Sequence, residues 1–377
     1  MLLTLRKIIT MRVIEQAEDI IEREQLGDSI LSYTTENFKI LERNAITSIA
    51  KDLNLARGTV TRWISLNNVP PQYTFDLMKL AREEIDYSKF SAKEKDQFFT
   101  PHDTAEYCYS VFKREMELLG LNEESFHYIE PSAGDGAFMR VLPRDRSVGL
   151  DIEPKADYII KHDYLTWEPT ESKNYVVFGN PPFGLRGHLA LQFIEHSAKF
   201  SDFVCFILPQ LFESDGKGSP RKRVGSYNLY HSEKIETNFY DPDGRQMRIN
   251  VVFQIWAKDY MKEEHRIKTF SDDQIKVYSL SNGASPSQQR NTDMLDKCDI
   301  YLPSTCFGED NMRCYPTFEE LPGQKGYGVI FKEHKQEMIE LSQYVDWPEV
   351  SFLSTNSAFN LRTSKIKETL LELLDNC

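Results

Sequence analysis

The chain has 377 residues, 40% of them hydrophobic, and a formal net charge of −13. This length and apolar content can bury a substantial core, and they predict a soluble globular protein of two or three domains. The negative charge argues against a protein that coats nucleic acid nonspecifically, because Lys and Arg make the phosphate contacts. Any contact with nucleic acid is therefore expected to be local.

Targeting and metal-binding signals are missing from the sequence. The longest apolar stretch, residues 203–212, is far short of the roughly 18 residues that a membrane span needs, and residues 1–13 lack the continuous core of a signal peptide. We therefore expect no membrane association and a cytoplasmic location, or the nucleic-acid-containing compartment of a host. The six cysteines form no CxxC pair, which predicts reduced thiols and no metal site.

The first predicted domain, residues 1–88, reads as helical and contains a pattern typical of a helix-turn-helix. Between Ile46 and Ile64 the apolar residues are spaced as in two short helices that face each other across a turn. Asn54 can adopt the left-handed conformation that such a turn requires. The residues expected to face each other are Ile49, Ala50, Leu53, Leu55, Val60 and Ile64.

The second of these helices has polar side chains that could contact DNA. Arg57, Thr59, Thr61 and Arg62 would point outward, and such side chains can reach phosphates and base edges in a major groove. The alternative is a small helical hairpin that packs on a neighbouring element. The sequence favours DNA contact, because this window has three basic residues and one acidic residue.

The second predicted domain, residues 89–290, alternates apolar runs with polar helical stretches. The runs are FHYIE, SVGLD, YII, YVVFGN, FVCFILP and NVVFQIW. This texture predicts an α/β fold with a doubly wound, mostly parallel sheet. Asp243-Gly244 is a hairpin signal, so we expect the sheet to end in an antiparallel pair. Residues 279–293 have the composition of an exposed connection.

Small and acidic residues follow successive predicted strands. In EPSAGDGAF, residues 130–138, the small residues would let the backbone approach a ligand, and Asp135 could cap a following helix. Asp151 ends the next run and suits the hydroxyls of a ribose, and Asp163 follows the third run and could accept from an adenine amine. Each acid alone could be a helix cap or a solvated loop residue. Together they favour a nucleoside that lacks phosphates and carries a positive centre, as S-adenosylmethionine does.

Five segments in order resemble the motifs of the S-adenosylmethionine-dependent amino-methyltransferases. They are FFTP (98–101), EPSAGDGAF (130–138), VGLDIEP (148–154), KHDYL (161–165) and FGNPPFG (178–184). The order is similar to that of the gamma group of adenine-N6 DNA methyltransferases. The resemblance covers roughly residues 97–256 and implies a class I, Rossmann-like methyltransferase fold.

The resemblance also implies which residues bind S-adenosylmethionine. Thr100 and Pro101 would hold its methionine end, and Glu130, Ser132 and Gly134 would line the methionine and sulfonium region. Asp151 would take the ribose hydroxyls, Ile152 would lie against the adenine, and Asp163 would accept from the adenine amine. The neighbouring motif residues expected at the same site are Phe99, Pro131, Asp135, Gly136, Tyr164 and Asn180.

The residues Asn180, Pro181, Pro182 and Phe183 would form the catalytic motif. The side-chain oxygen of Asn180 and the carbonyl of Pro181 can each accept one N–H of an adenine amino group, which orients its lone pair. The prolines fix the backbone, and Phe183 would stack on the base. A base inside a duplex cannot reach such a pocket, so the adenine must be flipped out or single-stranded.

Two further segments bear on the substrate. The loop at residues 216–223 places Lys217, Arg221, Lys222 and Arg223 where they could contact phosphates, although an ordinary solvated loop would have the same composition. The third predicted domain, residues 291–377, occupies the place of a target-recognition region but has no motif.

The motifs do not identify which polymer is methylated. Related amino-methyltransferases modify RNA adenines or glutamine side chains, and a DNA-binding regulator with an inactive methyltransferase domain is a further alternative. The helix-turn-helix pattern favours DNA, with a separately encoded restriction endonuclease as a possible partner. The chain would act as a monomer or homodimer.

Overall fold

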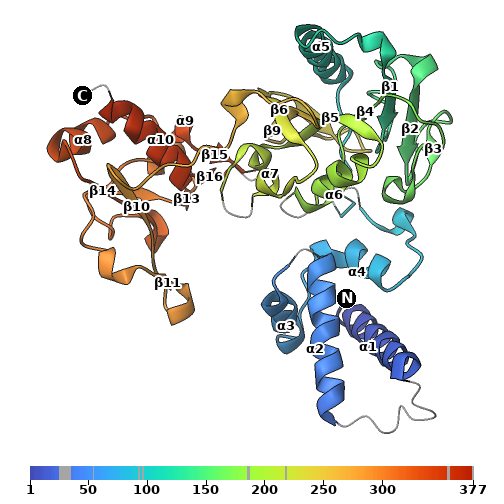
Figure 1. Ribbon diagram of the computed structural model, residues 1–377, viewed down its shortest axis with the longest axis horizontal. Helices are drawn as coiled ribbons and strands as arrows, with labels where there is room; N and C mark the ends of the chain where they lie inside the picture. Colours follow the sequence, from blue (N-terminus) through green and yellow to red (C-terminus); the bar gives the residue numbers. More distant parts are fainter. Residues whose placement is uncertain are drawn as a thin grey trace. The chain divides into compact units, whose positions relative to one another are not determined.

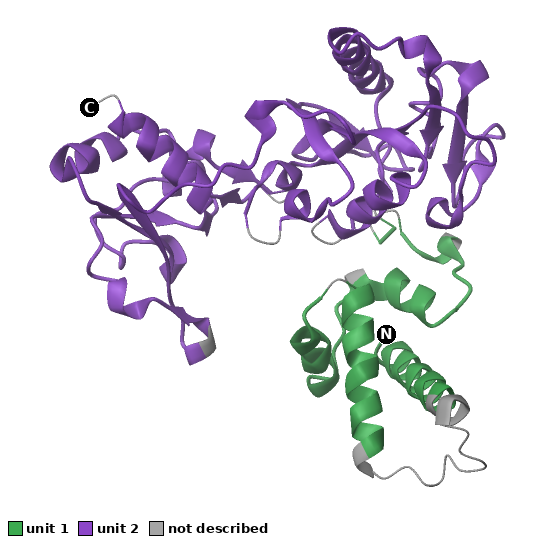
Figure 2. Ribbon diagram, viewed as in Figure 1, with its two compact units in different colours: residues 1–95 green, residues 96–377 purple. Residues whose placement is uncertain are grey.

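The computed structural model describes residues 1–24, 35–53, 55–91, 94–95, 97–184, 187–216, 219–354 and 357–375. The chain divides into two compact units, Met1–Lys95 and Asp96–Cys377 (Figures 1 and 2). The predicted limit at residue 88 lies close to this division.

The first unit is helical. Its α-helices are α1 (Leu2–Glu24), α2 (Thr35–Asp52), α3 (Arg57–Ser65) and α4 (Thr74–Leu80). Ile49 and Leu53 at the end of α2 and Val60 of α3 are buried in one core with Leu5 and Ile8 of α1. These contacts have the spacing that the sequence predicts for two facing helices, while the DNA-binding role of α3 stays a prediction. Asn54, the expected turn residue, lies outside the described residues.

The second unit contains a seven-stranded sheet in the order β3-β2-β1-β4-β5-β9-β6. The strands are β1 (His127–Glu130), β2 (Ser147–Asp151), β3 (Ile160–Lys161), β4 (Tyr175–Gly179), β5 (Ser201–Pro209), β6 (Asn228–Ile235) and β9 (Val251–Ala257). Strands β1 to β5 pair in parallel, and β9 runs antiparallel to both β5 and β6. The mostly parallel sheet and its antiparallel end are confirmed, and they fit a class I methyltransferase fold.

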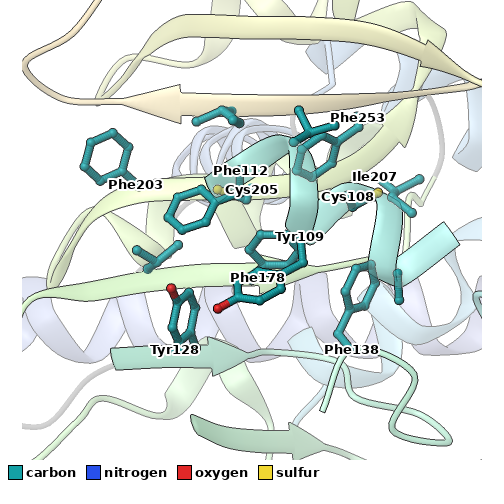
Figure 3. Packing of buried hydrophobic residues seen from close by; sticks show 14 of the residues in the cluster. Cys108, Tyr109, Phe112, Tyr128, Phe138, Phe178, Phe203, Cys205, Ile207 and Phe253 are labelled. Atoms are coloured by element: carbon teal, nitrogen blue, oxygen red, sulfur yellow. The ribbon is translucent and has the colours of Figure 1, made fainter. Parts of the chain in front are cut away.

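Helices cover both faces of this sheet because its strands are apolar on both sides. The helix α5 (His102–Leu118) packs on one face, where Cys108 and Phe112 meet strand residues such as Phe178 (Figure 3). The helix α6 (His188–Ser197) packs on the other face against Val177 and its neighbours. Alternate residues of β4 therefore belong to two separate cores, as expected for a central strand.

Two local expectations are corrected or refined. Residues 131–143, all of them described, form successive turns rather than the helix that Asp135 was expected to cap. The Asp243-Gly244 turn joins β7 (Asn238–Tyr240) to β8 (Gln246–Arg248), and Gly244 has a φ of +78°. These two strands form a small sheet of their own, so this hairpin is separate from the antiparallel end of the main sheet.

The C-terminal part, residues 275–375, forms two further sheets and three α-helices among the described residues. Its strands are β10 (Ile275–Asn282), β11 (Gln289–Arg290), β12 (Ile300–Pro303), β13 (Thr305–Cys306), β14 (Lys325–Phe331), β15 (Phe352–Leu353) and β16 (Phe359–Asn360). Its helices are α8 (Lys335–Ser342), α9 (Trp347–Val350) and α10 (Thr363–Leu374). The interpretation of residues 279–293 as an exposed connection is wrong at its start, because Ser279–Asn282 belong to β10 and Ser279–Ser281 pair with β14.

The C-terminal part contacts loops that follow strands of the main sheet. Arg362 donates from Nε to the Ser214 hydroxyl over 3.1 Å, and the Ser364 hydroxyl donates to Asp215 over 2.5 Å. The Asn250 side chain donates to the Ser354 carbonyl over 3.2 Å. These contacts lie beside the carboxyl end of β5 and the start of β9.

Candidate active site

The carboxyl ends of β1, β2 and β4 bring the predicted site residues together. In the parallel register Glu130 of β1 lies opposite Gly149 of β2, and Ile129 lies opposite Val177 of β4. The residues that directly follow these strands therefore lie side by side at one edge of the sheet, which is where open α/β sheets bind ligands.

Asn180 directly follows β4 and is held by two hydrogen bonds. Its Nδ2 donates to the Thr100 hydroxyl over 3.2 Å, and its backbone carbonyl accepts from the Ser132 hydroxyl over 3.2 Å. Its side-chain oxygen Oδ1 is buried without a hydrogen-bond partner in the protein. An unpaired buried acceptor is costly, so its presence here indicates a site that expects a donor from a ligand.

Asn180 lines a pocket whose other walls are mostly apolar. The lining residues are Phe98, Asn180, Pro181, Phe183, Phe239 and Ile249. About 10 Å³ of this pocket is open to a body the size of a water molecule, so a larger ligand could enter only after lining side chains move. Three aromatic rings around one polar acceptor suit a flat heterocycle that carries a hydrogen-bond donor.

The glycine-rich loop after β1 has the left-handed backbone that its sequence suggests. Gly134 has a φ of +52° and Gly136 a φ of +82°, values that L side chains rarely adopt. The Gly134 N–H donates to Asp151 Oδ2 over 2.7 Å and thereby joins the loop to the end of β2. A Cβ at Gly134 would lie 3.0 Å from the Phe99 ring, and one at Gly136 would lie 2.4 Å from the Tyr158 hydroxyl oxygen.

Two of the predicted acids lie at adjacent strand ends. Glu130 is 2% exposed and accepts from the Met139 N–H over 3.0 Å, and burial raises the pKa of its carboxyl well above the usual range. The second oxygen of Asp151 accepts from the Glu153 N–H over 2.7 Å, and burial raises the pKa of Asp151 as well. A carboxylate oxygen has two lone pairs, so Asp151 keeps acceptor capacity for ribose hydroxyls beside these backbone bonds.

Of the predicted site residues near the ends of β2 and β3, Ile152 is exposed, whereas Tyr164 is buried in the core. Asp163 accepts from the Leu165 N–H over 3.1 Å, and Ile152 is 37% exposed. Tyr164 is a correction to the predicted set. It is 1% exposed, and its hydroxyl lies 2.6 Å from the Ser197 hydroxyl of α6, so its side chain packs in the core instead of facing a ligand.

The remaining predicted motif residues lie in or near the glycine-rich loop and the pocket. Pro101 precedes the first residue of α5, and Pro131 is buried, as is Thr100. Asp135 contacts Arg140 over 3.2 Å and accepts from the Tyr240 hydroxyl over 2.8 Å, which replaces the helix-capping role expected for it. Pro182 is half-buried and lies between the pocket residues Pro181 and Phe183.

The predicted DNA-contacting residues lie in several environments. On α3, Arg57, Thr61 and Arg62 are exposed and Thr59 is half-buried. In the basic loop Lys217 lies outside the described residues, and Lys222 is exposed. Arg223 is half-buried.

Arg221 is a correction to this set. It is half-buried and donates to the backbone carbonyls of Glu213, over 2.9 Å, and His265. Its guanidinium therefore fastens the basic loop to its surroundings rather than pointing toward a phosphate.

Sequence reasoning missed four residues of the site. Phe98, Phe239 and Ile249 line the pocket, and Tyr240 bonds to the glycine-rich loop. The pair Phe239-Tyr240 lies in an alternating strand, which is a signal for two opposite-facing side chains. The tertiary partner of each side chain could not be read from that alternation.

Comparisons with known proteins give one relative and several distant structures. No family model matches the chain. The chain is 30% identical over 116 residues to the type II methyltransferase M.CvrRI of Paramecium bursaria Chlorella virus XZ-6E, which takes in 26% of this chain and 28% of that protein. The match thus spans little more than a quarter of that relative's length.

The similar solved structures include a candidate RNA methyltransferase of Pyrococcus horikoshii, with a TM-score of 0.32, 17% identity, and coverage of 43% of this chain and 86% of that chain. A chain from work on the assembly and conformational transition of the type I R-M system has a TM-score of 0.32, 13% identity, and coverage of 68% and 69%. A Thermoplasma acidophilum protein has a TM-score of 0.29, 17% identity, and coverage of 42% and 86%. TM-scores this low carry no argument about function.

The described residues contain neither a membrane-spanning helix nor a cluster of metal-ligating side chains. None of the helices among them is long and apolar enough to cross a membrane. No group of three or more His, Cys, Asp and Glu side chains in the described chain is arranged to hold a metal ion.

Proposed function

We propose that this chain is a methyltransferase that transfers a methyl group from S-adenosylmethionine to the N6 amino group of an adenine extruded from a specific DNA sequence. The buried and unpartnered Oδ1 of Asn180 carries this proposal. Support also comes from the ordered motifs, from their meeting at one sheet edge, and from the similarity to a type II methyltransferase.

The chemistry follows from what an adenine amino group lacks. Its lone pair is drawn into the ring, so it is a poor nucleophile until its nitrogen becomes pyramidal. Oδ1 of Asn180 and the carbonyl of Pro181 would each accept one N–H and favour that geometry. S-adenosylmethionine would supply the methyl group, while Asn180 and the Pro181 carbonyl would orient the amino group until one N6 proton leaves to solvent.

The Asn180 amide is oriented so that its acceptor is the end left without a partner. Its Nδ2 donates to the Thr100 hydroxyl, and Oδ1 has no partner in the protein. The reverse orientation would present a donor to the N–H groups of adenine. The observed orientation therefore suits a substrate that donates at this point.

The residues around the glycine-rich loop fit S-adenosylmethionine. Asp151 and the exposed side chain of Ile152 would hold its ribose and adenine, and Asp163 would accept from its amine. Glu130, Ser132 and Gly134 would line the methionine. When bound, the cofactor supplies a methyl group on a positive sulfonium, which acidic surroundings favour.

The aromatic pocket would hold the target base. Phe183 would stack on one face of the adenine, and Phe98 and Phe239 line the same space. Since little of this space is open, the side chains must part as the base enters. A base stacked in a duplex cannot reach such a pocket, so the substrate adenine would be flipped out of its duplex.

A transfer assay tests the proposal. The purified chain is incubated with S-adenosylmethionine labelled in its methyl group and with DNA, RNA or protein, and modified nucleosides are identified by mass spectrometry. We expect N6-methyladenine in DNA. Label in RNA would assign the RNA alternative and label in protein a glutamine-type substrate. Methylcytosine without N6-methyladenine would overturn the assignment, and no transfer at all would favour an inactive, DNA-binding regulator.

A further inference from the structure

Two pairs of consecutive aromatic residues lie against each other beside the pocket. The pairs are Phe98-Phe99, ahead of α5, and Phe239-Tyr240 in β7. An antiparallel bridge joins them, in which the Phe99 N–H donates to the Tyr240 carbonyl over 2.8 Å and the Tyr240 N–H donates to the Phe99 carbonyl over 3.2 Å. The centroids of the Phe99 and Tyr240 rings are 5.7 Å apart. We call these four residues the aromatic bridge.

The aromatic bridge touches two different sites. Consecutive residues of an extended chain point to opposite sides. Phe98 and Phe239 line the pocket that contains Asn180. Phe99 lies against Gly134, and Tyr240 donates to Asp135, so the other two rings contact the glycine-rich loop.

A hydrogen bond from Tyr240 to Asp135 joins the aromatic bridge to the glycine-rich loop. The distance from the Tyr240 hydroxyl to Asp135 Oδ2 is 2.8 Å, and Arg140 approaches the same oxygen to 3.2 Å. Burial and the neighbouring carboxylate raise the pKa of Tyr240 to about 12, so its hydroxyl keeps its proton at neutral pH and donates. Hydrogen bonds to a charged acceptor are stronger than neutral ones.

The hairpin that carries Phe239 depends on these contacts. Strands β7 and β8 pair with each other and form a sheet of two strands. A two-stranded hairpin is marginally stable by itself. Its attachments among the described residues include the core packing of Phe239 and Met247, the bridge to Phe99 and the hydrogen bond from Tyr240 to Asp135. A shift of the glycine-rich loop would be transmitted through Tyr240 to the pocket wall.

We infer that the aromatic bridge couples the two sites, with Tyr240 as the positioning residue that makes the target-base pocket depend on an occupied cofactor loop. This inference rests on the proposed function, because it takes the pocket as the base site and the loop as the cofactor site. It predicts that cofactor and extruded base bind cooperatively, and that the cooperativity passes through the Tyr240 hydroxyl. Coupling of this kind is typically about 5- to 150-fold in affinity.

The test uses the full chain and the DNA sequence that it methylates in cells, with 2-aminopurine in place of the target adenine. Duplex affinity and the fluorescence of the extruded base are measured with and without S-adenosylhomocysteine. The ratio of the two affinities is the coupling factor. Tyr240→Phe removes the hydroxyl and keeps the ring. Tyr175→Phe is the matched control, since it removes a hydroxyl that donates to the Glu171 carbonyl, on a residue at the start of β4.

We expect the wild-type chain and Tyr175→Phe to show the same coupling factor, and Tyr240→Phe to lower it at least about fivefold. The affinity of Tyr240→Phe for S-adenosylhomocysteine alone should change much less. Loss of mere packing would weaken both binding steps and leave the ratio unaltered. An unchanged ratio in Tyr240→Phe overturns the inference.

Asp135→Ala provides a second route from the loop side. It should lower the coupling factor, and adding Tyr240→Phe to it should cause little further loss, because both remove the same hydrogen bond. Additive losses would also overturn the inference. A wild-type chain that binds no S-adenosylhomocysteine or methylates no DNA would instead refute the proposed function, and the inference would fall with it.

Discussion

Residues 1–95 and residues 96–377 differ in how their charge is distributed. The first unit contains 14 basic and 14 acidic residues, so the net charge of −13 belongs entirely to the second unit. In the first unit Arg57, Thr61 and Arg62 are exposed on α3, whereas in the second Glu130 is buried and Asp151 and Asn180 are half-buried at the strand ends. The net charge of the whole chain therefore does not report the local charge of a helix such as α3, and it is the local charge that bears on contact with nucleic acid.

The site at the strand ends should respond most strongly to loss of the unpaired acceptor of Asn180. Asn180→Ala removes Oδ1, and we expect the turnover rate to fall about 100- to 1,000-fold, as for other single preorganised hydrogen-bonding groups. The affinity for S-adenosylmethionine should be nearly unchanged. Single-turnover kinetics and calorimetry measure the two quantities, and a variant with half of the wild-type rate would exclude this role for Asn180.

The next largest effect is expected on cofactor binding. Asp151→Ala removes a carboxylate that we expect to hold two ribose hydroxyls, and it also releases the Gly134 N–H. Hydrogen bonds to charged groups contribute about 1.5 to 3 kcal/mol, so the affinity should fall about 10- to 150-fold. Calorimetry with S-adenosylhomocysteine provides the measurement. Unchanged affinity would move the ribose contact to another residue.

Burial of an acid in the second unit also predicts a pH-dependent effect on stability. Burial raises the pKa of Glu130, so the folded chain retains a proton that the unfolded chain loses above the ordinary glutamate value of 4.5. Stability is therefore lost as pH rises from that value toward the raised pKa. Glu130→Gln should avoid this loss and gain up to about 1.4 kcal/mol per pH unit relative to wild type over that window. Denaturant titrations from pH 4 upward check the trend, and a constant difference would contradict it.

The first unit should give the smallest effect, and one that depends on salt. Replacing Arg57 and Arg62 together by Ala should weaken duplex binding several-fold. The slope of log affinity against log salt should flatten by about 1.8 if both residues contact phosphates. Sequence preference should relax instead if either arginine reads a guanine. Cofactor affinity should stay the same.

A control for the arginine pair is a chain that begins near Tyr87. Both proteins are compared with wild type on one methylatable duplex over a salt series. If affinity, salt slope and methylation pattern are unchanged in both, the first unit takes no part in substrate recognition. The exposed Lys222 and the C-terminal part would then be the remaining candidates.

In the second unit the sequence predicts the features that depend on short stretches of chain, namely the strands and the polar residues at their ends. The apolar runs predict the strands, and the polar residues that end these runs, Glu130, Asp151 and Asn180, lie at one sheet edge. Tyr164 was assigned to the site by its neighbour Asp163, yet its hydroxyl meets Ser197 of α6, a residue far along the chain. Adjacency in a motif does not determine which way a side chain turns when a helix packs over it.

The other errors have the same physical origin. Residues 279–293 are rich in Ser, Gly and Gln, but their first residues pair with β14, which lies much later in the sequence. Arg221 has the composition of a phosphate-binding residue and instead satisfies two backbone carbonyls. Long-range pairing overrode local composition at both places.

The aromatic bridge also restricts how the length of this chain can change during evolution. Phe98 lines the pocket while Phe99 lies against the glycine-rich loop because the two residues are consecutive, and the same holds for Phe239 and Tyr240. Inserting or deleting one residue beside either pair would exchange the sides to which the two rings point. Substitution of one ring by another keeps this arrangement, so these positions should vary in identity but not in spacing.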